Sequence, residues 1–177
     1  MPLSSNSIFC EIANIRHNSI NKSIVIEEPD NNETSHLKSV EIRGFEDIYF
    51  ATKLDLSGYQ FLGNLVKDGF LKKSCDAIIF AKIKGINYSI LVELKSQRRT
   101  SIPEKFKNCI AFFEYLKSIY KHYYQNDLNN FKQINLLFDR QTNSRNTSFE
   151  GKIEGICIKH RGFGKNKGSI DIRSLID

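Results

Sequence analysis

The sequence lacks long apolar runs. Nowhere in its 177 residues does an apolar stretch approach the roughly 20 residues that a membrane-spanning helix needs. The N-terminus, MPLSSNSIFCEIANIR, also lacks the basic segment and long apolar stretch that together mark a signal peptide. We therefore expect a cytoplasmic protein that has no membrane partner.

Closely spaced cysteines are also missing. Cys10, Cys75, Cys109 and Cys157 are far apart along the chain and form no CxxC pair. This spacing indicates neither a zinc site nor a disulfide framework. We expect four reduced thiols, most of them buried as small apolar side chains.

Acidic residues are in the minority. The chain has 20 Asp and Glu against 26 Lys and Arg, which gives a net charge of +6. A basic surface suits a polyanionic partner, because Lys and Arg that bind phosphates release condensed counterions. Many basic proteins never bind nucleic acid, however, and the sequence contains no helix-turn-helix, zinc-finger or RNA-binding signature. Charge alone therefore leaves the partner open.

The apolar pattern predicts one domain over residues 1–177, of mixed α/β (α+β) class, without internal repeats or an interdomain linker. Residues 1–38 contain the β-leaning runs IFCEIANI and KSIVIEE, and we interpret them as an irregular strand-bearing extension. Apolar residues at helical spacing predict a short helix over 45–54. Two apolar runs on either side of KGIN, between residues 75 and 96, predict a β-hairpin with Gly85 in its turn.

The strongest helix signal lies in SIPEKFKNCIAFFEYLKSIYKHYYQ, which predicts a helix over 103–124 with Ser101 as its N-cap. An apolar stripe at steps of three and four residues, expected to face the core, comprises Phe106, Cys109, Ile110, Phe113, Leu116, Tyr120 and Tyr123. QINLLFD predicts a strand over 133–138, and GKIEGICIKH predicts another strand. The Gly- and Lys-rich RGFGKNKGS then completes a basic strand and tail over 150–177.

The predicted hairpin carries charges that apolar strands should exclude. A turn of two residues (Gly85 and Ile86) or of four (84–87) places Asp76 opposite Lys95 and Ile78 opposite Glu93. Because side chains alternate along a strand, Asp76, Glu93 and Lys95 then share one face. A cross-strand salt bridge between Asp76 and Lys95, with Glu93 in solvent, would also explain these residues.

An Asp on one strand and Glu-x-Lys on the next, here CDAIIF followed by VELKS, resembles the PD-(D/E)xK nuclease superfamily, the fold of many restriction endonucleases and resolvases. The core of that superfamily runs helix, three strands, helix, strand, and the elements expected between about residues 40 and 140 follow a similar order. Cys75 stands where the superfamily often has proline. The resemblance implies a restriction-endonuclease-like mixed central sheet flanked by helices.

The resemblance also implies a metal-dependent nuclease. Phosphodiester hydrolysis needs an activated water and compensation for developing negative charge. Asp76 and Glu93, with the carbonyl of Leu94, would ligate Mg²⁺, with Mn²⁺ as a possible substitute, since these ions prefer hard oxygen ligands. Lys95 would orient the attacking water and stabilise the transition state. Gln97, on the same face, would contact a phosphate or a metal-bound water.

Further site residues remain open at this point. Glu46, in the predicted first helix, is our candidate for an additional catalytic acid, with Glu41 and Asp47 as rivals; it equally suits a solvated helix start. The expected DNA contacts are basic: Arg98, Arg99, Lys159, Arg161, Lys165 and Lys167. We expect a homodimer acting on DNA. A non-catalytic nucleic-acid-binding or subunit-interaction domain of the same fold, or a nuclease for RNA or branched DNA, are the alternatives.

Overall fold

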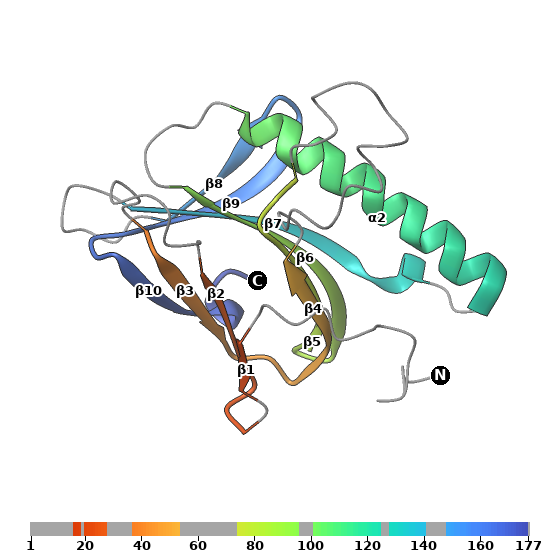
Figure 1. Cartoon of the computed structure of the whole chain (residues 1–177), viewed down its shortest axis with the longest axis horizontal. Helices are drawn as coiled ribbons and strands as arrows, with labels where there is room; N and C mark the ends of the chain where they lie inside the picture. The colour runs from red at the N-terminus through yellow and green to blue at the C-terminus, as the bar shows by residue number, and fades with distance from the viewer. Residues whose placement is uncertain are drawn as a thin grey trace.

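The computed structural model describes residues 16–18, 20–27, 37–53, 74–95, 101–124, 128–140 and 148–176. Within these ranges the chain is mixed α+β and forms three layers (Figure 1). A six-stranded sheet lies in the middle, the helix α2 (Ile102–Tyr124) covers one of its faces, and a four-stranded sheet covers the other. No helix in this part of the chain is long and apolar enough to cross a membrane.

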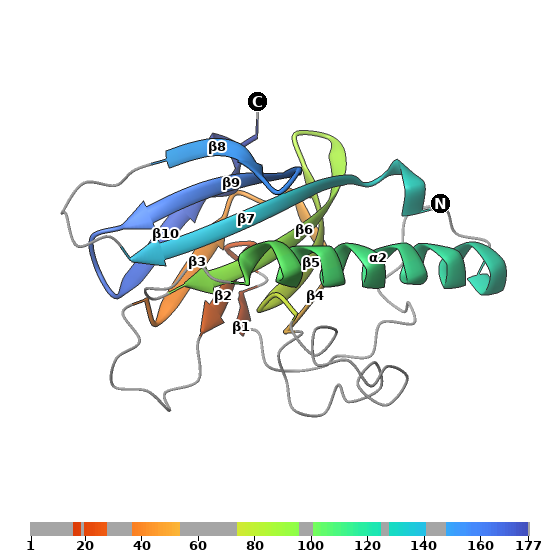
Figure 2. The same cartoon turned by 90° about the horizontal axis from the view of Figure 1, so that it is seen from above.

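The six-stranded sheet has the order β4-β5-β6-β7-β9-β8. Its strands are β4 (Asp47–Lys53), β5 (Ala77–Ile83), β6 (Ile86–Lys95), β7 (Lys132–Arg140), β8 (Ser148–Ile153) and β9 (Ile156–Phe163). The first three form an antiparallel meander, while β6, β7 and β9 are parallel to one another. The carboxyl ends of β6, β7 and β9 therefore meet at one edge of the sheet (Figure 2).

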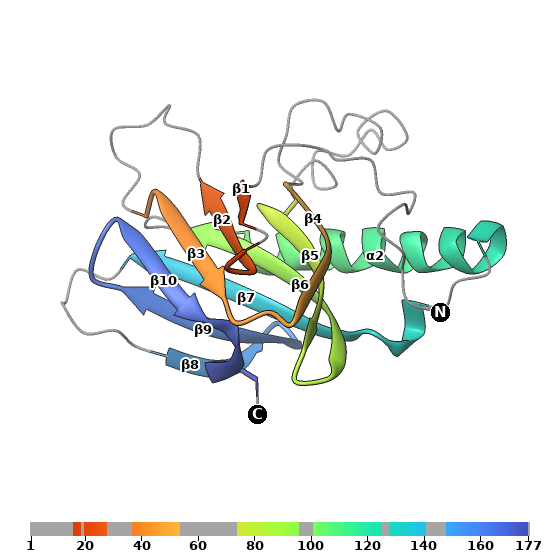
Figure 3. The same ribbon diagram turned by 90° about the horizontal axis from the view of Figure 1, so that it is seen from below.

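The four-stranded sheet has the order β1-β2-β3-β10 and lies across the central sheet (Figure 3). It comprises β1 (Arg16–Asn18), β2 (Ser23–Glu27), β3 (Ser39–Arg43) and β10 (Lys167–Asp171). The run KSIVIEE thus forms a strand of this sheet, whereas the run IFCEIANI lies outside the described residues. The tail expected at RGFGKNKGS is also wrong, because β9 continues to Phe163 and β10 pairs in parallel with β3.

Two apolar cores hold the layers together. Ile24, Val40 and Ile42 pack between the sheets against residues such as Ala77 and Val92. The second core lies between the central sheet and α2, where the helix contributes Ile102, Phe106, Cys109 and Phe113. Alternation along each central strand sends one residue to the first core and the next to the second. Burial on both faces accounts for the nearly continuous apolar sequence of β5 and β6.

The helix predicted over 103–124 is confirmed, with Ser101 directly before its first residue and the Ser101 carbonyl accepting the Lys105 N–H at 3.0 Å. The core stripe is correct only for the first half of the helix. Tyr123 is 80% exposed, because the last turns of α2 extend beyond β5 and β6 (Figure 2).

The helix predicted over 45–54 is wrong, since this segment contains β4. The pairing of β4 with β5 shifts between Ile48 and Phe50, which marks a β-bulge at Tyr49. As a result Tyr49 and Phe50 both pack toward α2, whereas Ile48 and Ala51 pack toward the four-stranded sheet. The bulge interrupts the two-residue alternation of a strand and leaves a spacing that resembles a helix.

The predicted hairpin is confirmed, but its register differs from the one expected. Its turn consists of Lys84 and Gly85, with φ of 48° and 76°, the left-handed backbone that type I′ turns need at both positions. Ala77 therefore pairs with Val92, where the expected register pairs it with Leu94. A shift of two residues leaves every side chain on the face predicted for it.

The single strand expected in GKIEGICIKH is a second hairpin, formed by β8 and β9. Glu154 and Gly155 make its turn, again with positive φ at both residues (47° and 84°). The first position of this turn is not a glycine, so only the second position carries the glycine that signals positive φ, and the turn in GKIEGICIKH was not predicted.

Candidate active site

Asp76, Glu93 and Lys95 lie on the α2-facing side of the central sheet. Asp76 directly precedes β5. When the observed register is extended by one residue, Asp76 lies opposite Glu93, not opposite Lys95 as expected. Glu93 and Lys95 are two residues apart near the end of β6, so they project to the same face. The sequence therefore assigned the face correctly and the cross-strand partner incorrectly.

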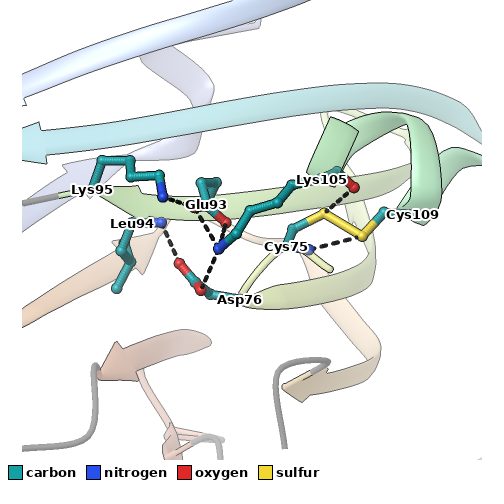
Figure 4. Close-up of polar contacts among 7 residues, drawn as sticks. All are labelled: Cys75, Asp76, Glu93, Leu94, Lys95, Lys105 and Cys109. Carbon is teal, nitrogen blue, oxygen red and sulfur yellow. Dashed lines mark hydrogen bonds and ion pairs between the residues drawn. A yellow bond between two sulfur atoms is a disulfide. The ribbon is translucent and has the colours of Figure 1, made fainter. Parts of the chain in front are cut away.

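The two carboxylates are buried. Glu93 has an exposed fraction of 0% and Asp76 of 6%. The backbone N–H of Leu94 donates to Asp76 Oδ2, and Lys95 Nζ lies 3.2 Å from Glu93 Oε1 (Figure 4). The solvated Glu93 and the Asp76–Lys95 salt bridge of the alternative interpretation are thus wrong, since Glu93 is the buried partner of Lys95.

A second lysine, Lys105, reaches the site from the first turns of α2. Its Nζ lies 2.7 Å and 3.0 Å from the two carboxylate oxygens of Glu93 and 3.8 Å from Asp76 Oδ1. The ammonium therefore lies between the two carboxylates (Figure 4). Lys105 was not among the predicted site residues, although the sequence carries a signal for it. Lys105 follows Ile102 by three positions and precedes Cys109 by four, which places it on the apolar stripe of the helix.

The four charged groups balance. Two carboxylates and two ammoniums give a net charge of zero, and the side chains of Lys95 and Lys105 are only 20% and 19% exposed. An isolated buried charge is very costly, and an ion pair in the interior is tolerated when its geometry is good and its polar atoms are satisfied. The short contacts explain how two carboxylates remain in so apolar a sheet.

The cysteines on either side of the site are joined. A disulfide connects Cys75, which precedes Asp76, with Cys109, one turn beyond Lys105 on α2 (Figure 4). The Cys75 N–H also donates to Cys109 Sγ at 3.0 Å. Our expectation of reduced thiols is wrong for this pair, because folding brings together residues that are 34 positions apart. Cys157 is free but exposed, not buried.

A buried polar pair lies on the same sheet face, on the two strands beyond β6. His160 Nε2 lies 2.8 Å from Asp139 Oδ1, and both residues are largely buried. Asp139 is the parallel neighbour of Lys95. The β7–β9 pairing brings Asp139 and His160 together, although they are 21 positions apart in the sequence. The polar part of this face thus continues from Asp76 across to β9.

The candidates for an additional acid lie elsewhere. The Glu46 carboxylate accepts the N–H of Gly85 at the hairpin turn, at the opposite end of β5 from Asp76. In the β4–β5 register, Asp47 lies opposite Lys82, near that same end. At about 3.3 Å per residue, the seven residues of β5 separate this end from Asp76 by roughly 20 Å. These acids therefore do not join the carboxylates of the site.

Glu41, the remaining rival, lies on β3 in the other sheet and contacts Arg43 and Ser169. Gln97, Arg98 and Arg99 lie outside the described residues.

Two of the basic residues expected to bind DNA lie on the opposite face of the central sheet from the carboxylates. Lys159 and Arg161 pair in register with Leu136 and Phe138, whose side chains face the four-stranded sheet. Lys159 Nζ also lies 3.0 Å from Glu150 Oε2. They are therefore separated from the carboxylates by the central sheet.

Lys165 and Lys167 are better placed. Both are exposed; Lys165 follows the end of β9, on the side of the central sheet where β6 also ends, and Lys167 begins β10 of the four-stranded sheet. The same end of β6 carries Lys95.

The donor atoms suit a hard divalent cation. Within the part of the chain that the structure describes, no cluster of three or more His, Cys, Asp or Glu side chains could hold a metal. Asp76 and Glu93 nevertheless offer two carboxylates, and the Lys105 ammonium stands as a cation between them. Mg²⁺ is commonly held by one or two protein carboxylates and keeps water or phosphate as its other ligands. The residues present therefore fit Mg²⁺.

Comparisons of this chain with protein families, with curated proteins and with solved structures find no match.

Proposed function

We propose that this chain is a Mg²⁺-dependent DNA endonuclease of the PD-(D/E)xK type. The observation that carries the proposal is the meeting of Asp76, Glu93 and Lys95 on one face, at the open end of a hairpin. Buried carboxylates at the end of apolar strands are costly, and a cation site gives a reason for both of them.

The arrangement of the surrounding elements supports the same proposal. The antiparallel strands β4, β5 and β6 are followed by α2 and then by β7, parallel to β6. Three strands, a helix and a strand are the order of the superfamily core after its first helix. The segment 45–54, which we had assigned to that first helix, contains the first of the three strands.

The residues would act as follows. When bound, Mg²⁺ would supply positive charge beside the scissile phosphate and lower the pKa of a water molecule. Asp76 and Glu93 would hold the ion, and the Leu94 N–H fixes the Asp76 carboxylate through Oδ2. The Lys95 ammonium, 3.2 Å from Glu93, would orient the attacking water and stabilise the negative charge of the transition state.

DNA would approach along the edge where β6 and β9 end. Exposed Lys165 and Lys167 lie there, and Arg98 and Arg99 follow β6 in the sequence. Cutting both strands of a duplex would need two such sites and hence a homodimer. If Lys165 and Lys167 contact phosphates, their replacement by glutamine should make the plot of log DNA affinity against log salt concentration less steep. The slope should change by about 0.9 for each lost contact. An unchanged slope would remove them from the interface.

A second function, a non-catalytic nucleic-acid-binding or subunit-interaction domain, is favoured by one observation. The Lys105 ammonium already neutralises the carboxylates without a metal. In that case the four charges would serve only the stability of the fold.

Single substitutions decide between the two functions. Purified protein is incubated with plasmid, linear duplex, single-stranded DNA and RNA in Mg²⁺ or EDTA, and Mg²⁺ affinity and melting temperature are measured on the same samples. For an enzyme, Lys95→Ala should slow cleavage about 100-fold or more while Mg²⁺ still binds. Asp76→Asn should abolish both metal binding and cleavage.

Lys107→Ala is the control, because it also removes one lysine charge, but Lys107 is half exposed on α2 and pairs with Glu154. It should cleave at the wild-type rate. Undiminished cleavage in EDTA, or a Lys95→Ala protein as active as the wild type, would refute the proposed mechanism. Lower stability of the Lys95 and Asp76 variants, without cleavage by any form of the protein, would establish the non-catalytic domain.

A further inference from the structure

Lys105 lies where a cation held by both carboxylates would lie. Its ammonium is within 3.0 Å of both Glu93 oxygens and 3.8 Å from Asp76 Oδ1. An ammonium and a divalent cation cannot share this position, because both need the same carboxylate oxygens and they repel each other. The ammonium must leave the gap whenever a divalent cation enters it.

The side chain of Lys105 can leave while its backbone stays in place. The Lys105 N–H bonds to the Ser101 carbonyl at 3.0 Å, and the disulfide fixes the neighbouring turn at Cys109. The ammonium itself stands on a flexible four-carbon stem, and 19% of the side chain is exposed. A rotation about the side-chain bonds is therefore enough to carry the charge toward the surface.

The charge balance of the site changes when this happens. Asp76, Glu93, Lys95 and Lys105 together are neutral, so a divalent cation among them creates an excess of two positive charges. Each phosphodiester group of a nucleic acid brings one negative charge. A phosphate that contacts the displaced Lys105 ammonium and the cation together would lower this excess from two charges to one, and a second phosphate nearby would remove the rest.

From this geometry we propose that Lys105 is a resident counter-cation that couples metal binding to nucleic-acid binding. Without nucleic acid, Lys105 neutralises Asp76 and Glu93 and competes with the divalent cation. With nucleic acid, its ammonium moves to a phosphate and the cation binds tightly. The inference rests on the proposed metal-dependent nuclease. It adds a residue that occupies the gap between Asp76 and Glu93 when no metal is bound.

The test is calorimetric titration of Mn²⁺ into the full chain. Lys105→Met keeps most of the side-chain length and removes the charge, so it should bind Mn²⁺ at least 10-fold more tightly than the wild type. Lys107→Met removes a charge on the same helix that pairs only with Glu154 among the contacts seen, and it should bind like the wild type. Lys105→Gln is a second neutral variant, should Lys105→Met fail to unfold cooperatively.

A second titration needs no variant. Mn²⁺ is titrated into the wild-type protein with and without a short DNA duplex whose linkages are phosphorothioate, so that it resists cleavage. The duplex should raise the Mn²⁺ affinity at least 10-fold, and Mn²⁺ should raise the affinity for the duplex by the same factor. In Lys105→Met this coupling should be weaker than in the wild type.

The outcomes separate the inference from the function on which it rests. Equal Mn²⁺ affinity of the wild type and the neutral variants, or no effect of the duplex on the wild type, overturns the role of Lys105. If the wild type still cleaves DNA with Mg²⁺ in that case, the proposed function survives alone. Absence of Mn²⁺ binding in every protein, with and without the duplex, overturns both.

Discussion

Loss of the Cys75–Cys109 disulfide should lower the free energy of unfolding. The size of the loss depends on the length of the loop that the disulfide closes. The bond closes a loop of 34 residues, which connects the start of β5 with the third turn of α2. In the chain-entropy description, closing such a loop removes about 13 cal/mol/K of entropy from the unfolded state, which stabilises the fold by about 4 kcal/mol at 25 °C. This is a large share of the stability of a typical domain, about 5–15 kcal/mol.

Cys109→Ser is the variant of choice, because the serine hydroxyl can still accept the Cys75 N–H that now donates to Cys109 Sγ. Urea unfolding followed by circular dichroism should show a loss of about 4 kcal/mol under oxidising conditions. Wild-type protein in reductant should become similarly unstable. Cys157→Ser, which removes an exposed free thiol, is the control and should unfold like the wild type.

Two results would refute this reasoning. Wild-type protein that is as stable in reductant as without it would show that the bond does not contribute. Alkylation of all four cysteines in denatured, unreduced protein, measured by mass, would show that the bond is not formed. A further consequence concerns the site: Cys75 adjoins Asp76 and Cys109 lies one turn from Lys105, so reduction should also weaken their alignment.

Gly44→Ala should destabilise the fold more than Gly155→Ala, although both glycines have positive φ (90° and 84°). A Cβ on Gly44 would overlap the Asp171 carboxylate, whereas nothing lies within 4 Å of one on Gly155; equal losses in denaturant unfolding would contradict this. The Arg173 hydrogen bond lowers the pKa of Asp171 from 3.8 to about 2, so its contribution to stability is complete above pH 3.8 and is lost as the pH falls through about 2. Asp171→Asn should remove this part of the acid destabilisation, and parallel stability–pH curves for variant and wild type would refute it. Glu93→Gln should cost about 3 kcal/mol or more, because it removes the buried carboxylate that contacts two partly buried ammoniums. A loss in urea unfolding no larger than that of a surface pair, about 1 kcal/mol or less, would contradict the burial argument.

The sequence by itself determined the features that depend on neighbouring residues. The apolar stripe around Phe106 and Phe113 specified α2, and the two apolar runs on either side of Gly85 specified the β5–β6 hairpin. It also assigned Glu93 and Lys95 to one face, because alternation along a strand does not change when the register shifts by two residues.

Only the tertiary structure decided which residues meet across the chain. Whether segment 45–54 becomes a helix or a strand depends on its pairing with β5, and the bulge at Tyr49 conceals the strand pattern. Lys105 reaches Glu93, and Cys75 reaches Cys109, only because α2 packs on this face of the central sheet. Such contacts join residues separated by 12 and 34 positions. Local periodicity fixes the direction of each side chain from its own element, whereas the packing of one element against another decides what that side chain touches.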